Sequence, residues 1–66
     1  MTLGSDTRNR RRQLGLGQRD LADLAGVSER FVREVESDKA TIRLDKLSDL
    51  LDALGLEITL RIKDSA

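Results

Sequence analysis

The 66-residue sequence contains no Cys, His, Pro, Trp or Tyr, and its single aromatic residue is Phe31. The absence of Cys excludes disulfide bonds, and the absence of both Cys and His removes the usual ligands of zinc and haem sites. Without His, Cys or Tyr, the chain also lacks several groups that enzymes often use for nucleophilic attack and proton transfer. We therefore expect no metal, no cofactor and no catalytic activity.

Long apolar runs are absent as well. No stretch approaches the roughly 20 apolar residues of a transmembrane helix, and the N-terminus lacks the apolar core of a signal peptide. We therefore expect a cytoplasmic protein that makes no membrane contact. The length predicts one domain over residues 1–66. Because so small a domain is only marginally stable alone, and disulfides and metals are excluded, we expect it to self-associate.

The charges are unevenly distributed, although the net charge is zero. Residues 1–33 carry seven Arg and four acidic residues, whereas residues 34–66 carry five basic and eight acidic residues. Every base in the first half is Arg, whose planar guanidinium suits two-pronged contacts with phosphate and guanine. This distribution is compatible with nucleic-acid binding and also with simple solvated helix faces.

The apolar pattern predicts an all-α fold of four or five short helices. Ser5 or Asp6 is expected to cap a first helix that runs to about Leu14. Residues 18–25 and 28–36 form two further short helices, the second of them capped by Ser28. A fourth helix begins near Arg43. Its leucines follow helical spacing and form one apolar stripe, which is expected to lie in the core or in a dimer interface: Leu44, Leu47, Leu50, Leu51 and Leu54.

Residues 56–62 follow a different pattern, because apolar and polar residues alternate at every step. This period of two predicts a half-buried β-strand. A lone strand has no partner within the chain, so we expect it to pair with the same strand of a second copy across a two-fold axis. The alternative is a frayed extension of the fourth helix. The residues expected to form the dimer contact are Leu56, Ile58, Leu60 and Ile62.

The two central helices form a recognisable constellation. Ala22 is small enough to allow a close helix crossing, and Gly26 supplies a sharp turn. Val27, Val32 and Val35 are spaced to fix the crossing angle. This arrangement predicts a helix-turn-helix, in which the helix over residues 28–36 enters the major groove of DNA.

The sequence resembles the Xre/Cro-type repressors, in which Gly-Leu-Thr-Gln, Leu-Ala, Gly-Val-Ser and Glu-Asn-Gly-Lys recur in this order. The resemblance covers about residues 3–62. The matching segments are 15–18, 21–22, 26–28 and 36–39, and the resemblance continues through 41–47 and 53–56. With its terminal strand, the chain looks most like the HipB-type antitoxins. The resemblance implies a lambda-repressor-like domain that represses transcription as a homodimer on a palindromic operator. It also implies that the protein neutralises a HipA-like kinase toxin and represses their shared operon.

The resemblance, together with the exposed positions of the pattern, assigns the DNA contacts. Arg30 and Arg33 are expected to read guanine, and Glu29 to accept from a cytosine amino group. Phosphate contacts are expected from the helix starts and from the loop after the recognition helix. The complete expected set is Gln18, Arg19, Ser28, Glu29, Arg30, Arg33, Glu34, Lys39 and Arg43.

The resemblance further implies a salt bridge between Arg11 and Glu36. The sequence departs from the family pattern in three places: Gly17 replaces Thr or Ser, Ser37-Asp38 replaces Asn-Gly, and Thr7 replaces an apolar residue. The other arginines of the first helix are expected to be solvated or to steer phosphates: Arg8, Arg10 and Arg12. A competing interpretation is a protein-interaction module that neutralises a partner toxin without binding DNA.

Overall fold

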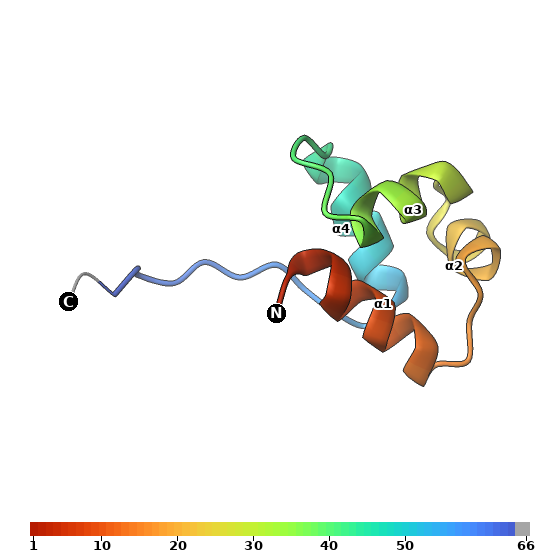
Figure 1. The fold of residues 1–66 in the computed structure, drawn as a ribbon, viewed down its shortest axis with the longest axis horizontal. Coiled ribbons are helices and arrows are strands. Elements are labelled where there is room, and N and C mark those ends of the chain that lie inside the picture. Colours follow the sequence, from red (N-terminus) through yellow and green to blue (C-terminus); the bar gives the residue numbers. More distant parts are fainter. Residues whose placement is uncertain (65–66) are drawn as a thin grey trace.

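The computed structural model describes residues 1–64, which fold into four α-helices without a β-strand (Figure 1). The helices are α1 (Leu3–Gln13), α2 (Gln18–Ala25), α3 (Glu29–Glu36) and α4 (Leu44–Ala53). The all-α prediction is therefore confirmed, with the predicted bounds of α2 and α3 reproduced closely. Among the described residues, no helix is long and apolar enough to cross a membrane.

The start of α1 differs from the prediction, because Thr2 caps it rather than Ser5 or Asp6. The Thr2 hydroxyl accepts from the Ser5 backbone N–H at 3.1 Å, and the Ser5 hydroxyl accepts from the Thr2 backbone N–H at 2.9 Å. This reciprocal pair satisfies two donors at once, whereas a cap at Ser5 would satisfy only one. The helix therefore begins at Leu3 and includes Gly4.

The turn between α2 and α3 is set by two residues. Gly26 ends α2 with φ 71°, a left-handed conformation that side chains disfavour. Ser28 then begins α3, its hydroxyl accepting from the Phe31 backbone N–H at 3.0 Å. Val27 between them packs against the core. These local interactions fix the direction in which α3 leaves α2.

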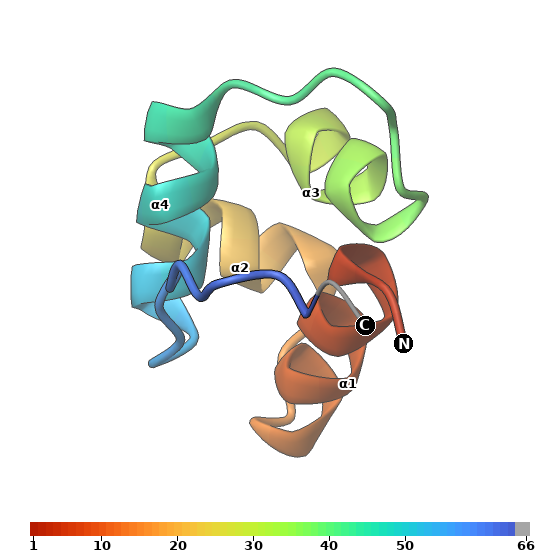
Figure 2. The ribbon, with the colours of Figure 1, turned by 90° about the vertical axis from the view of Figure 1, so that its left-hand side faces the viewer.

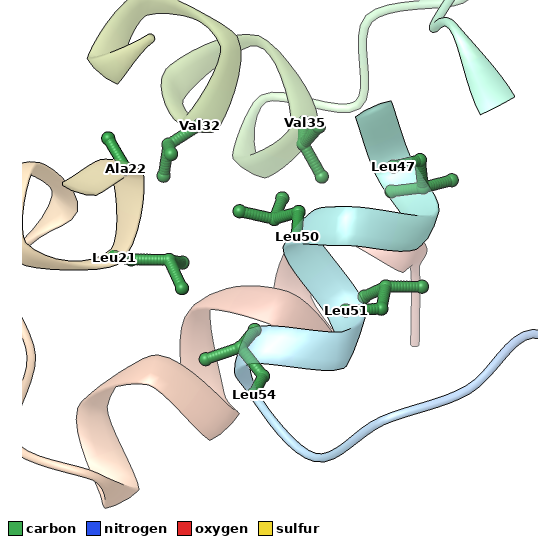
Figure 3. Close-up of a cluster of buried hydrophobic side chains, with 8 residues drawn as sticks. All are labelled: Leu21, Ala22, Val32, Val35, Leu47, Leu50, Leu51 and Leu54. Atoms are coloured by element: carbon green, nitrogen blue, oxygen red, sulfur yellow. The ribbon is translucent and has the colours of Figure 1, made fainter. Parts of the chain in front are cut away.

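The apolar core is built by α2, α3 and α4 (Figure 3). Leu50 of α4 lies at its centre and is completely buried. The core residues are Leu21, Ala22, Val32, Val35, Leu47, Leu50, Leu51 and Leu54. Leu44 was predicted to belong to this stripe, but it is 67% exposed. It is the first residue of α4, where the helix has not yet reached the other two.

Helix α1 contributes no side chain to the apolar core, and polar contacts hold it in place. Arg8 donates to the backbone oxygen of Glu36 at the end of α3, at 3.3 Å. Arg10 donates to the backbone oxygen of Leu54 at the end of α4, at 2.9 Å. Both guanidiniums thus meet the free carbonyl groups of a helix C-terminus. The sequence did not predict these two contacts. The side chain of Arg8 nevertheless remains 44% exposed, and Arg12 is exposed as expected.

The chain beyond α4 leaves the helical body and extends away from it (Figures 1 and 2). Gly55 ends the helix with φ 71°, which excludes the predicted alternative of a longer fourth helix. Leu56 still packs on the core, but Leu60 and Ile62 are 98% and 96% exposed. The strand predicted over residues 56–62 is not formed in the single chain. A strand takes its hydrogen bonds from a neighbouring strand, and the described part of this chain offers none.

Candidate nucleic-acid interface

Helix α3 exposes the face that the sequence predicts for base reading. Its buried residues are Val32, Val35 and Glu36. On the outer side, the side chains of Arg30 and Arg33 are 81% and 55% exposed. The two arginines therefore stand out from the molecule on a helix whose opposite face is locked into the core.

Each of these arginines has a carboxylate partner one turn away on α3. The Arg33 Nη1 atom lies 3.4 Å from Glu29 Oε1, and the Arg30 Nε atom lies 3.7 Å from Glu34 Oε1. The pairs are exposed, so each contributes little to stability. They do set the charge of the face, because two cations are balanced there by two carboxylates.

The loop after α3 brings further cations beside the recognition helix. Lys39 Nζ pairs with the Glu34 carboxylate. Arg43 Nη2 lies 2.6 Å from Asp45 Oδ2. The hydrogen bond from Lys39 lowers the pKa of Glu34, and the hydrogen bond from Arg43 lowers the pKa of Asp45. These carboxylates are consequently ionised at neutral pH.

A small hollow of about 190 Å³ lies between α3, this loop and α4. It is smaller than most ligand pockets, which span roughly 300–1,000 Å³. Its lining carries three cations, of which Lys46 in α4 was not predicted as a site residue. A single cation in the first turn of a helix gives no sequence signal of its own. The lining residues are Phe31, Glu34, Lys39, Thr41, Ile42, Arg43 and Lys46.

The residues predicted at the two helix starts behave differently from one another. Arg19, in the first turn of α2, is exposed. Gln18 is half-buried, and its side-chain amide donates to Glu36 Oε1 at 3.3 Å. Ser28 is exposed, but its hydroxyl already accepts a hydrogen bond as the cap of α3. The structure thus places Gln18 against an internal carboxylate.

That carboxylate, Glu36, joins three helices. Arg11 donates to Glu36 through two nitrogens, Nε to Oε2 at 2.7 Å and Nη2 to Oε1 at 2.9 Å. The predicted salt bridge is therefore confirmed. Burial alone would raise the pKa of Glu36, but hydrogen bonds from Arg11, Gln18 and Arg8 outweigh it and lower the pKa. The network holds α1 and the start of α2 against the recognition helix.

Asp38 adds a contact that sequence reasoning missed. It adopts a left-handed conformation with φ 58°, at the position where the family pattern has Gly. Its Oδ1 atom accepts from the Gly4 backbone N–H at 2.8 Å, near the start of α1. Asp tolerates this conformation better than most side chains. The loop of the interface is thereby tied to α1.

Comparisons with known proteins agree with this geometry. A family model described as helix-turn-helix matches residues 8–60. The uncharacterized HTH-type transcriptional regulator y4mF of Sinorhizobium fredii is 36% identical over 56 residues, which cover 85% of this chain and 74% of the relative.

Two solved structures have the same fold. A chain of a HipA-HipB-O2-O3 complex matches with a TM-score of 0.82 and 24% identity, over 94% of this chain and 87% of the other. A protein called MDT protein matches with the same TM-score, identity and coverage. Together with the family match and the exposed face of α3, these findings show that the chain belongs to the helix-turn-helix family of DNA-binding transcriptional regulators.

Proposed function

We propose that the protein is a sequence-specific repressor of transcription. The observation that supports this most directly is the exposure of Arg30 and Arg33 on the outer face of α3. In helix-turn-helix proteins this face enters the major groove, where Arg recognises guanine through O6 and N7. Arg19, Lys39 and Arg43 are exposed around it and suit contacts with phosphates. The family relation also favours a role without catalysis. We further propose that the protein works in the cytoplasm.

The proposal includes a homodimer on a palindromic operator. Residues 56–62 alternate in polarity and leave apolar side chains in solvent, including Leu60 and Ile62. Antiparallel pairing with a second copy would cover these side chains and satisfy the backbone groups of both segments. Two recognition helices related by this axis would reach successive major grooves, about 34 Å apart.

A regulatory partner completes the proposal. We infer that the protein is the antitoxin of a HipA-like kinase and represses the operon that encodes both. The support is the resemblance to HipB-type antitoxins and the fold shared with a chain of the HipA-HipB-O2-O3 complex. Co-expression with the product of the adjacent gene tests this. A complex that survives purification would support the antitoxin role, and the absence of any adjacent kinase gene would contradict it.

The decisive test of DNA reading is a charge reversal on α3. The double variant Arg30→Glu/Arg33→Glu should lose specific binding to the protein's own promoter. We expect a loss of at least about thirtyfold, since two guanine contacts at about 1–3 kcal/mol each contribute about 2–6 kcal/mol together. Arg12→Glu measures the general effect of reversing one exposed Arg, because Arg12 is exposed in the last turn of α1, which lies away from α3 (Figures 1 and 2). It should weaken promoter binding far less than the double variant does.

A second candidate function is a protein-interaction module that neutralises a toxin without binding DNA. The observation in its favour is the pairing of the interface cations with carboxylates, including Glu29, Glu34 and Asp45. Unchanged promoter binding by the double variant, or no promoter binding by the wild type alone and with its partner, would favour this second function.

A further inference from the structure

Four of the cations expected to meet DNA, all on α3 or in the segment between α3 and α4, are paired with carboxylates in the unbound protein. Arg33 pairs with Glu29, Arg43 pairs with Asp45, and Glu34 serves both Arg30 and Lys39. One carboxylate in the middle of the interface thus holds two cations from two different elements, the recognition helix and the loop that follows it.

Glu34 differs from the other interface carboxylates in its placement. Its side chain is 25% exposed, against 45% for Glu29 and 65% for Asp45. It also lines the hollow that contains Lys39, Arg43 and Lys46. A carboxylate at this position lies among the groups that would approach a phosphate. The hydrogen bond from Lys39 lowers its pKa, so it keeps its negative charge at neutral pH.

Competition with phosphate follows from this geometry. Non-specific binding to DNA comes almost entirely from cations that neutralise phosphates and release counter-ions. A cation already paired with Glu34 releases fewer counter-ions, and the carboxylate itself repels nearby phosphates. At a correct site, by contrast, contacts with the base edges add binding free energy that does not depend on phosphates alone. The penalty therefore falls mainly on DNA that offers phosphates alone.

We propose that Glu34 is a specificity-determining residue that suppresses binding to non-cognate DNA by holding Arg30 and Lys39. This inference rests on the proposed DNA-binding function and adds a role for one side chain within it. The carboxylate acts through the two cations that it holds. Its main effect is on the ratio of the affinity for operator DNA to the affinity for random DNA.

The test compares Glu34→Gln with the wild type on a random-sequence duplex and on the promoter fragment that the wild type binds. Gln keeps the size of the side chain and removes its charge. Binding to the random duplex at 0.1 M salt should become about five- to tenfold tighter, as expected for one additional phosphate contact. The slope of log K against log salt should also steepen by about 0.9. The ratio of promoter to random affinity should fall.

Asp52→Asn is the matched control. Asp52 is exposed near the end of α4, so this substitution removes one negative charge away from the interface. It should change random-duplex affinity by less than twofold. Thermal unfolding of both variants checks that the fold is intact.

Two results would overturn the proposal while leaving the repressor function standing. One is an unchanged affinity of Glu34→Gln for random DNA. The other is a selective loss of promoter binding, which would make Glu34 a base contact. If neither the wild type nor the variant binds any duplex, the DNA-binding function itself is overturned, and this inference with it.

Discussion

Glu36 is the residue on which the polar contacts of the domain converge. It is 4% exposed and accepts hydrogen bonds from Arg8, Arg11 and Gln18. A buried carboxylate is tolerated only when charged and polar partners compensate for its lost hydration. Here the partners come from α1 and α2, so one side chain of α3 orients this helix, which we propose reads DNA, relative to the rest of the domain.

Replacing Glu36 by Ala should therefore destabilise the protein strongly. The variant leaves the Arg11 guanidinium, only 10% exposed, without its carboxylate partner. Removing one member of a buried pair costs about 3 kcal/mol or more. Urea unfolding at a fixed protein concentration measures the effect. Glu57→Ala, an exposed acid of the C-terminal segment, is the control and should change the free energy of unfolding by less than 0.5 kcal/mol.

The pH dependence of stability has a defined sign at Glu36. Because the folded protein lowers the pKa of this carboxyl, ionised Glu36 stabilises the fold above its unfolded pKa of about 4.3. That contribution is lost as the pH falls from there through the folded pKa. The difference in unfolding free energy between wild type and Glu36→Gln should thus be constant above about pH 5 and shrink below it. A difference that grows on acidification would contradict the network described above.

At the scale of the element, α1 is attached by close backbone contact as well as by arginines. A Cβ added to Gly4 would lie 2.6 Å from the Glu36 backbone oxygen and 2.8 Å from the Val35 backbone oxygen. Backbone atoms cannot move aside as a flexible side chain can. The end of α3 and the start of α1 therefore approach to a distance that only Gly permits.

Gly4→Ala should lower the free energy of unfolding by about 1–3 kcal/mol, since α1 must move away from α3. The gain in helix propensity from Ala offsets at most about 1 kcal/mol of this loss. Asn9→Ala is the control, because Asn9 is exposed on the same helix. Thermal unfolding checks both. A Gly4→Ala variant as stable as the control would show that the close approach contributes nothing.

The elements also show what the sequence can and cannot predict. Helices α2 and α3 follow from apolar spacing, Gly26 and Ser28, and the bounds agree with the prediction. The arginine contacts with the ends of α3 and α4, and the contact from Asp38 to Gly4, join positions far apart in the sequence. Such contacts leave no periodic pattern, so they become visible only in three dimensions. The exposed face of α3 was predictable, and the i, i+4 spacing of its Arg–Glu pairs is visible in the sequence. The contact from Lys39 to Glu34 depends on the course of the loop after α3, which spacing does not fix.

At the scale of the whole molecule, the C-terminal segment is the part that the single chain leaves incomplete. Its alternating residues predict a strand, and residues 1–64 provide no partner strand for it. The double variant Leu60→Ser/Ile62→Ser should therefore shift the protein from dimer to monomer, because it removes the apolar face that a second copy would cover.

Sedimentation at several protein concentrations measures this shift. Thr59→Ser/Arg61→Ser alters the intervening polar positions and serves as the control, which should remain dimeric. A double variant with the mass of the wild-type dimer would place the dimer contact elsewhere on the molecule.

The central claim is that two copies of this chain bind operator DNA through α3. Its most direct test is binding of the purified protein to its own promoter across a salt series, with the mass of the complex determined in the same run. Arg19, Lys39 and Arg43 of each copy are the cations proposed to contact phosphates. Two copies therefore predict about six phosphate contacts and a slope of log K against log salt near −5. Promoter-specific, salt-sensitive binding by a dimer is the result that the structure predicts. A protein that ignores its promoter at low salt, both alone and with the product of its neighbouring gene, would contradict the claim.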